Sequence, residues 1–369
     1  MGRSYQIAVL PGDGIGPEVV GAALGVLEGL GLDLELREYP CGAGCYLERG
    51  TPLPDETLEG CRGADATLLG AMGDPRIRWP DGTEMRPQVD LRFKLDLYAG
   101  VRPIYLYAAH HTPLRGLAAG EIDFVLLREN VEGLFASMDA GIDLRGETAV
   151  DSMVITRTGT ERVARYAFEL ARERRRERGD GALRQRAACV TCVDKANILR
   201  SMAFFRRVFD EVAARYSDVD SGHAYVDAMA LHLVQRPRDF DVLVMENMYG
   251  DILSDLAAGL VGGMGMAPSG DIGEEAAVFQ PSHGTAPDIA GQGVANPVAT
   301  ILSAAMMLRW LGHRHRDGQA LAAAERVDGA VEKVLADPNA GTPDIGGVMT
   351  TGDLGREIAG AAAGAGLGG

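Results

Sequence analysis

The stretch QIAVLPGDGIGPEVVGAALGVLEG, residues 6–29, decides how the fold begins. A short apolar run predicts a strand, and three closely spaced glycines after it predict a tight turn. Pro17 and Glu18 then suit the first turn of a helix, where the missing proline N–H leaves no bond unmade and a carboxylate is favoured. The glycine spacing approaches that of a dinucleotide-binding loop, but the third glycine falls one place early. A tight turn that feeds a helix is therefore the preferred interpretation.

The same order of strand and helix repeats along the chain, which predicts an α/β fold. The predicted strands are 6–10, 66–69, 124–127, 150–155, 187–193 and 241–246. The predicted helices are 16–29, 160–178, 197–216, 251–260, 300–310 and 321–336. A length of 369 residues suggests two domains or one large domain. The last stretch, 359–369, contains only Ala, Gly and Leu, and is expected to fray.

Composition limits the classes of function. The net charge of −16 argues against general nucleic-acid binding and against adhesion to an anionic membrane. No apolar run is long enough to span a membrane, and no signal peptide is expected. Five cysteines favour a reduced, cytoplasmic protein over a disulfide framework. Cys189 and Cys192 have CxxC spacing but no second pair to complete a zinc site, so we interpret them as strand residues.

Three aspartates are candidate metal ligands. Asp251 and Asp255 are spaced to share one face of a helix, where two carboxylates repel unless a cation lies between them. Ligands with oxygen donors alone select a hard ion such as Mg²⁺ or Mn²⁺. Asp227 has apolar neighbours and is costly to bury without a partner. Each aspartate also fits a simpler role, as a helix-dipole or surface residue or in a structural ion pair.

Basic residues supply the candidates for substrate binding and proton transfer. Lys195 follows an apolar run and is either a general base or a surface lysine. Arg92, Arg102 and Arg128 stand at or near the edges of predicted elements, and arginine is the side chain best suited to bidentate carboxylate recognition. Each arginine alone equally fits an ordinary surface position, so their role depends on whether the fold brings them together.

Seven stretches, taken in order, resemble the β-decarboxylating 2-hydroxyacid dehydrogenases, the family of isopropylmalate, isocitrate, homoisocitrate and tartrate/D-malate dehydrogenases. The stretches are LPGDGIGPEV, LDLYAGVRP, LLREN-EG, VDKANIL, YVDAMALHLV, NMYGDILSDL and HGTAPDIAGQGVANP. The resemblance implies a two-domain isopropylmalate/isocitrate dehydrogenase-like α/β fold without a classical Rossmann domain. It implies a large cofactor-side domain, 1–100 and 263–369, and a small domain, 101–262, for dimerisation, metal and substrate.

The resemblance also implies oxidative decarboxylation of a 3-substituted (2R,3S)-malate with NAD and Mg²⁺ or Mn²⁺. The matching positions are Asp227, Asp251 and Asp255 for the metal, Arg92, Arg102 and Arg128 for the substrate carboxylates, Lys195 for the base, and His283, Gly284, Thr285, Ala286, Pro287, Asp288, Ile289 and Asn296 for the cofactor. A carboxylate at Asp288 would accept ribose hydroxyls and repel a 2′-phosphate, so NAD is expected rather than NADP. In a homodimer with shared active sites between the domains, Lys195 and Asp227 would come from the partner subunit.

Three features depart from the family pattern. Phe135 stands where the family has a catalytic tyrosine, so water or the lysine base protonates the enolate, or activity falls, or the reaction stops at oxidation. Arg86 and Gln88 lie in a segment shorter than that of isopropylmalate enzymes, and their polarity favours an anionic or polar C3 substituent. Isocitrate, homoisocitrate or a phosphonate analogue would provide one. Gln280 replaces an acid that commonly precedes the HGTAPD motif.

Other functions stay open. Within the family, the alternatives are 3-isopropylmalate and tartrate/D-malate dehydrogenase. Outside it, the departure at Phe135 allows a non-catalytic regulatory subunit, and the aspartates alone would suit a metal-dependent hydrolase. The expected partners are a small hydroxy acid and a second copy of the chain, without nucleic acid or membrane.

Overall fold

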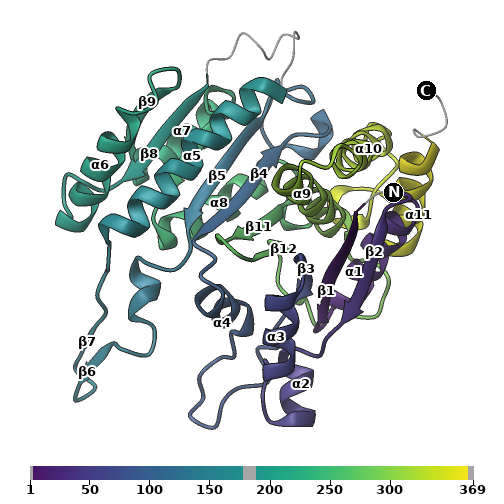
Figure 1. The fold of residues 1–369 in the computed structure, drawn as a ribbon, viewed down its shortest axis with the longest axis horizontal. Helices are drawn as coiled ribbons and strands as arrows, with labels where there is room; N and C mark the ends of the chain where they lie inside the picture. The colour runs from purple at the N-terminus through teal and green to yellow at the C-terminus, as the bar shows by residue number, and fades with distance from the viewer. Residues whose placement is uncertain (1–2, 178–187, 365–369) are drawn as a thin grey trace. The chain divides into compact units, whose positions relative to one another are not determined.

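The computed structural model describes residues 3–177 and 188–364. Contacts divide the chain into two compact units, each with its own strands and helices (Figure 1). The first unit contains Met1–Asp96, Tyr107–Pro113 and Val261–Gly369. The second contains Leu97–Leu106 and Leu114–Leu260.

The first unit has strands in the order β2-β1-β3-β12-β11, parallel except for β11. The strands are β1 Ser4–Gly12, β2 Asp33–Glu38, β3 Ala66–Ala71, β11 Pro268–Ile272 and β12 Ala277–Pro281. The helices are α1 Gly16–Glu28, α2 Gly42–Arg49, α3 Asp55–Gly63, α4 Pro87–Lys94, α9 Val298–His315, α10 Gly318–Leu335 and α11 Thr351–Gly364. The largely apolar α9 is buried against β3, β11, β12 and α10, and so forms the centre of this core.

The second unit has strands in the order β4-β5-β10-β8-β9, parallel except for β4. The strands are β4 Ala99–Tyr105, β5 Asp123–Glu129, β8 Cys189–Asp194, β9 Asp220–Tyr225 and β10 Val242–Met245, and the helices are α5 Arg157–Glu177, α6 Arg200–Ala213, α7 Val226–Gln235 and α8 Asn247–Gly259. Helices α5 and α6 cover one face of this sheet, and α7 and α8 cover the other (Figure 1). The exposed hairpin of β6 Ile142–Leu144 and β7 Thr148–Val150 projects from the sheet (Figure 1).

The glycine-rich turn after β1 is a structural turn that leads into α1. The backbone N–H groups of Asp13, Ile15 and Gly16 donate to the carbonyls of Ala71, Thr285 and Asp13 at 2.7, 2.9 and 2.9 Å. A dinucleotide-binding loop uses such N–H groups for phosphate, whereas here they are engaged within the protein. Helix α1 then begins at Gly16 with proline in its first turn. The interpretation of a tight turn that feeds a helix is confirmed.

The α/β prediction is confirmed, and two local predictions are wrong. Of the predicted strand 150–155 only Val150 lies in a strand, because the chain beyond it has a single bridge, from Val154 to Gly133, instead of a neighbouring ladder. Residues 359–364 do not fray but complete α11, since Ile358 and Ala362 are buried. Residues 365–369, and positions 178 and 187 at the ends of two predicted elements, lie outside the described residues.

All five cysteines are free. On β8, Cys192 is buried and Cys189 half-buried, as expected for strand residues three apart. Within residues 3–177 and 188–364, no helix combines the length and hydropathy needed to cross a membrane.

Candidate active site

Arg128 lies near the end of β5 with 1 % of its surface exposed. Its Nε and Nη2 donate to Oδ1 of Asn247 at 2.9 and 2.6 Å, and its Nη1 forms an ion pair with Asp251. The ring centroid of Phe135 lies 5.1 Å from the guanidinium carbon. A buried guanidinium requires such partners, because an unpaired buried charge is strongly destabilising. Arg128 is therefore a fixed cation beside a carboxylate and an aromatic ring.

Asp251 and Asp255 lie one turn apart on α8, as their spacing predicts. Partial desolvation raises the pKa of Asp255, the charge of Asp251 adds to the shift, and Arg102 and Arg128 oppose it. A divalent cation would relieve the repulsion between these carboxylates, whose oxygens are hard ligands. The pair therefore fits Mg²⁺ or Mn²⁺. In the described part of the chain, no third His, Cys, Asp or Glu completes a ligand group with them.

Lys195 and Asp227 form an ion pair with each other. Strands β8 and β9 are parallel, and Asp194 pairs with Tyr225 in their register, so the residues that follow both strands lie side by side. Hydrogen bonding to Lys195 holds the pKa of Asp227 below its usual range. The side chain of Asp227 remains 68 % exposed and that of Lys195 26 % exposed, so both stay accessible. Lys195, the candidate base, and the carboxylate of Asp227 therefore lie together where the neighbouring strands β8 and β9 end.

The other arginines are divided between the units. Arg102 lies on β4, where Gly100 pairs with Arg128 on the antiparallel neighbour β5. Because side chains two residues apart share a face, Arg102 and Arg128 lie on the same face of neighbouring strands. Arg92 lies on α4 of the first unit and is 7 % exposed. The structure therefore brings Arg102 and Arg128 together within the second unit.

A buried carboxylate holds Arg92. Its Nε donates to Oδ2 of Asp271 on β11 at 2.9 Å, and Nε2 of Gln280 donates to the same oxygen at 2.6 Å. A glutamine at position 280 can donate this bond, whereas an ionised acid would place a second negative charge beside Asp271. Arg86 and Gln88 lie half-buried at the start of the same helix α4.

The predicted cofactor loop follows β12 and packs on the glycine-rich turn. The closest approach is at Gly14, where a Cβ atom would lie 2.0 Å from the carbonyl oxygen of Thr285, and where φ is +58°. Ala286 and Ile289 pack against Ile15 and its buried neighbours. The remaining predicted members of the loop are His283, Gly284, Pro287 and Asp288. Close packing against the turn fixes the path of this loop.

Asn296 connects the loop to the core of the first unit. Its Oδ1 accepts from the backbone N–H of Val298 at 3.0 Å, and its Nδ2 donates to Asp344 at 3.1 Å. Burial lowers the pKa of His283, whose Nδ1 lies 2.9 Å from the carbonyl oxygen of Gly284. Asp288 is exposed, so its carboxylate is available to hydroxyl groups. The loop thus offers a neutral imidazole and an exposed carboxylate on a fixed backbone.

Buried polar residues at two strand ends were not predicted. Glu129 and Glu246 end the apolar runs of β5 and β10, and Asn247 follows Glu246. Burial raises the pKa of Glu129 to about 8 and also raises the pKa of Glu246, which accepts backbone N–H groups at the start of α8. The signal was a Glu-Asn pair directly after a buried strand, in REN and again in MEN. A buried polar residue needs partners, which sequence order alone does not identify.

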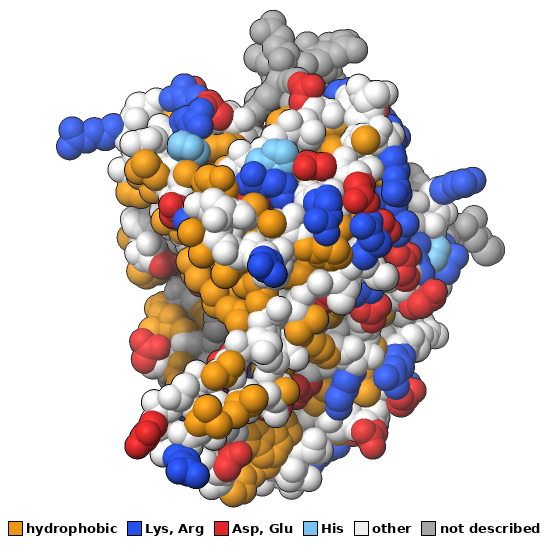
Figure 2. Space-filling model, turned by 90° about the vertical axis from the view of Figure 1, so that its left-hand side faces the viewer, with side chains coloured by type: hydrophobic (Ala, Val, Ile, Leu, Met, Phe, Trp, Pro, Cys, Tyr) orange, Lys and Arg blue, Asp and Glu red, His pale blue; other side chains and the backbone are white. Residues whose placement is uncertain are grey.

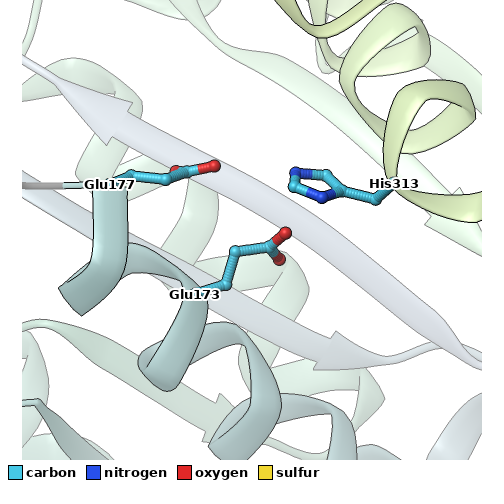
Figure 3. Close-up of side chains that lie close together, drawn as sticks. All are labelled: Glu173, Glu177 and His313. Atoms are coloured by element: carbon cyan, nitrogen blue, oxygen red, sulfur yellow. The ribbon is translucent and has the colours of Figure 1, made fainter. Parts of the chain in front are cut away.

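A separate acidic pair lies on α5. Glu173 and Glu177 are one turn apart and point to the same side of the helix (Figure 3). His313, drawn in the same view, belongs to α9 of the first unit. Acidic residues at this spacing are common on solvated helix faces, so we assign no site to this pair.

Comparison with known proteins identifies the family. The sequence profile described as isocitrate/isopropylmalate dehydrogenase matches residues 6–358. The chain belongs to this family. It is 43 % identical over 358 residues to the 3-isopropylmalate/3-methylmalate dehydrogenase of Methanocaldococcus jannaschii, covering 96 % of this chain and 98 % of that protein. The 3-isopropylmalate dehydrogenase of Archaeoglobus fulgidus is 42 % identical over 355 residues, with the same coverage of 96 % and 98 %.

A solved structure gives the same result. The crystal structure of isocitrate dehydrogenase from Methylococcus capsulatus superposes with a TM-score of 0.85 at 37 % identity, covering 97 % of this chain and 99 % of that one. Membership confirms the resemblance and the predicted fold, and makes this protein an oxidatively decarboxylating hydroxyacid dehydrogenase. The names of the curated relatives match the alternative prediction of 3-isopropylmalate dehydrogenase better than the predicted anionic C3 substituent.

Proposed function

We propose that this member of the isocitrate/isopropylmalate dehydrogenase family uses NAD and Mg²⁺ or Mn²⁺ to oxidise and decarboxylate a (2R,3S)-malate with an alkyl group at C3. 3-Isopropylmalate and 3-methylmalate are examples of this class. The observation that carries the proposal is the contact of the buried Arg128 with Asp251. To bind a hydroxy acid together with a divalent metal, a site needs a positively charged side chain for the substrate carboxylate and carboxylates for the metal. Here the guanidinium of Arg128 and the carboxylate of Asp251 are in contact.

Each unit supplies a distinct part of this chemistry. In the second unit Asp251 and Asp255 would hold the metal, with Asp227 of the partner subunit as third ligand. In the first unit the loop from His283 to Asn296 would hold NAD, with Asp288 accepting the ribose hydroxyls. When bound, the metal would polarise the C2 oxygen and NAD would accept the C2 hydride. The cytoplasmic location expected from the cysteine content stays a prediction.

Counting the protons of the proposed reaction shows why it can proceed with Phe135 at the position of the family's catalytic tyrosine. In the proposed reaction Lys195 accepts the proton of the C2 hydroxyl while the hydride leaves C2 for NAD. The resulting 2-oxo acid loses its β-carboxylate as CO₂, and the enolate that remains needs one proton at C3. The ammonium of Lys195 holds that proton, so no second side-chain acid is required for the balance. Phe135 instead packs against the guanidinium of Arg128.

The surroundings of Lys195 support an alkyl substituent. The N–H of Ile198 donates to the carbonyl of Lys195 at 3.0 Å, so both residues share one turn. The side chain of Ile198 is 70 % exposed. A substrate whose C2 hydroxyl reaches Lys195 would carry its C3 group close to this apolar surface, which favours alkyl burial and disfavours a carboxylate. The prediction of an anionic or polar substituent depended on Arg86 and Gln88, which both belong to the first unit.

A substrate panel tests the proposal. We expect the purified chain with Mg²⁺ to reduce NAD with the highest kcat/KM for 3-isopropylmalate or 3-methylmalate, releasing one CO₂ per NADH. EDTA should stop turnover and Mn²⁺ restore it. Isocitrate or homoisocitrate as the best substrate would overturn the alkyl assignment. No NADH with any acid, D-malate and tartrate included, would overturn the function and favour the regulatory-subunit or hydrolase alternative.

The variant Ile198→Asn adds an internal control. It should lower kcat/KM for 3-isopropylmalate by about tenfold, the effect of losing one apolar contact. D-Malate has no C3 substituent, so its kcat/KM should change by less than twofold. Equal losses with both acids would contradict the placement of the substituent against Ile198.

We propose further that the enzyme is a homodimer with shared active sites. Large apolar residues of the second unit, on and near the β6–β7 hairpin, α7, α8 and the turn after Lys195, are between 42 % and 70 % exposed: Ile142, Leu144, Val150, Val154, Ile198, Leu231, Val234 and Ile252. Figure 2 views the side where α6 and α7 lie and shows hydrophobic side chains gathered there. Such patches mark interfaces.

Complementation tests shared sites directly. Lys195→Ala and Asp251→Asn should each be inactive alone. When the two are co-expressed, half of randomly paired dimers are mixed, and each mixed dimer has one intact site, so about a quarter of the wild-type activity should return. Absence of recovery in mixed dimers, verified by two affinity tags, would reject shared sites. A monomer in light scattering would reject the dimer.

A further inference from the structure

We propose that Asn247 is a positioning residue that orients Arg128 for the substrate carboxylate; the inference rests on the proposed function. Asn247 is the first residue of α8 and is completely buried, with 0 % of its surface exposed. It does not reach solvent, so it acts through its neighbours. Its amide contacts two parts of the second unit at once.

The two ends of the Asn247 amide have different partners. Oδ1 accepts the Nε and Nη2 hydrogens of Arg128 at 2.9 and 2.6 Å, and Nδ2 donates to the carbonyl oxygen of Glu132 at 3.1 Å. A guanidinium only donates and a carbonyl only accepts, so the amide can have one orientation alone. Since Phe135 follows Glu132 by three residues, the same amide ties the guanidinium to the loop that carries the neighbouring ring.

Glycines on both sides allow this close approach. A Cβ atom on Gly250 would lie 2.6 Å from Cβ and Cγ of Arg128, so the first turn of α8 packs directly on the arginine stem. A Cβ atom on Gly133 would lie 3.0 Å from Cβ of Asn247, and Gly133 has φ of +75°, which favours glycine. The stem and the guanidinium of Arg128 are therefore both held by α8.

The neutrality of the amide matters as much as its position. Two hydrogens on one edge of the guanidinium are held by an uncharged oxygen, so Asn247 adds no negative charge to that of Asp251, which already forms an ion pair with Arg128. An aspartate at position 247 could accept the same two hydrogens, but it would add a carboxylate to the one that Asp251 already places on Arg128, weaken the attraction of Arg128 for a substrate carboxylate, and lose the bond to Glu132. At the start of a helix, however, aspartate is favourable for the dipole. A role of Asn247 in starting the helix alone would leave the KM for the acid unchanged in Asn247→Asp, whereas a positioning role would raise that KM.

The experiment compares Asn247→Asp with wild type. We expect the KM for 3-isopropylmalate to rise about tenfold or more and the KM for NAD to stay within twofold, while the thermal midpoint falls because the buried bond to Glu132 is lost. Asp317→Ala removes the cap that accepts from Gln319 and Ala320 at the start of α10. As the control for lost stability, it should lower the thermal midpoint without changing the KM for the acid. A KM for the acid within twofold of wild type in Asn247→Asp would overturn the proposal.

A double-mutant cycle tests whether Asn247 acts through Arg128. In an Arg128→Lys background, which lacks the two-hydrogen contact, Asn247→Asp should change the KM by less than twofold. If the two substitutions instead raise the KM for the acid by independent factors that multiply in the double variant, the proposal is overturned. If none of the tested acids supports NAD reduction by the wild type, the proposed function is wrong, but this result does not decide whether Asn247 orients Arg128. In that case the wild type, the two single variants and the double variant are compared by urea unfolding. Coupled changes in the free energy of unfolding at positions 247 and 128 support the orienting contact, and additive changes reject it.

Discussion

Gly14→Ala tests whether the glycine-rich turn serves the cofactor loop through packing. A Cβ atom at this position would lie 2.0 Å from the carbonyl oxygen of Thr285, and real Cβ contacts below 3.0 Å are essentially absent. The loop beginning at His283 must therefore move by about 1 Å or more, a displacement that costs about a hundredfold in well-positioned sites. The residue also has φ of +58°, and this left-handed conformation costs a non-glycine residue about 1–2 kcal/mol.

Two readouts follow from this geometry. The free energy of unfolding, from urea titration, should fall by at least about 1–2 kcal/mol. The KM for NAD should rise at least about tenfold, while the KM for the acid changes little, because the loop of residues 283–296 is the expected cofactor site. Gly21→Ala is a matched control on the adjoining helix α1, where a Cβ atom would meet nothing within 4 Å. It should raise the unfolding free energy by about 0.5–1 kcal/mol without changing either KM.

Unchanged stability together with an unchanged KM for NAD in Gly14→Ala would refute this reasoning. A rise in the KM for the acid alone would show that the turn serves substrate binding, and would place NAD elsewhere. Destabilisation without any kinetic change would separate the turn from the cofactor loop.

Three further predictions concern the second unit. Lys195→Ala should abolish turnover while NAD and the acid still bind in calorimetry; near-normal turnover would refute its role as the base. Phe135→Tyr should leave kcat equal or higher, because a hydroxyl at this position could donate the final proton, and a large loss would show that the substrate needs the bare ring. Burial raises the pKa of Glu129 to about 8 from its ordinary value of 4.5, so the folded state binds the proton of this carboxyl more tightly than the unfolded state. Its contribution to stability is complete below about pH 4.5 and is lost as the pH rises through about 8, so Glu129→Gln should flatten the decline of urea midpoints between pH 5 and 8; parallel pH profiles of the two proteins would contradict this.

The helices and strands that could be predicted from sequence are those that their own local residue pattern specifies. Helix α1 starts at Gly16 because Pro17 favours a first turn, and β5 and β10 are apolar runs that have to be buried on both faces. Strands β2, β4, β6, β9, β11 and β12 were not predicted; β4, β9 and β11 contain glycine, and β4 and β11 also contain proline. They form strands because a neighbouring strand offers hydrogen bonds, a condition that no local pattern records.

By itself the sequence determined the alternation of strands and helices, the carboxylate spacing on α8 and the set of candidate acids, arginines and lysine, because periodicity and residue chemistry are local properties. Only the tertiary structure decided which of these groups touch. Register places Lys195 beside Asp227, and α8 brings Asn247 and Asp251 onto Arg128 across 119 and 123 residues of chain. Contacts between distant residues depend on how strands pair and helices pack, and the same local sequence is compatible with many such arrangements.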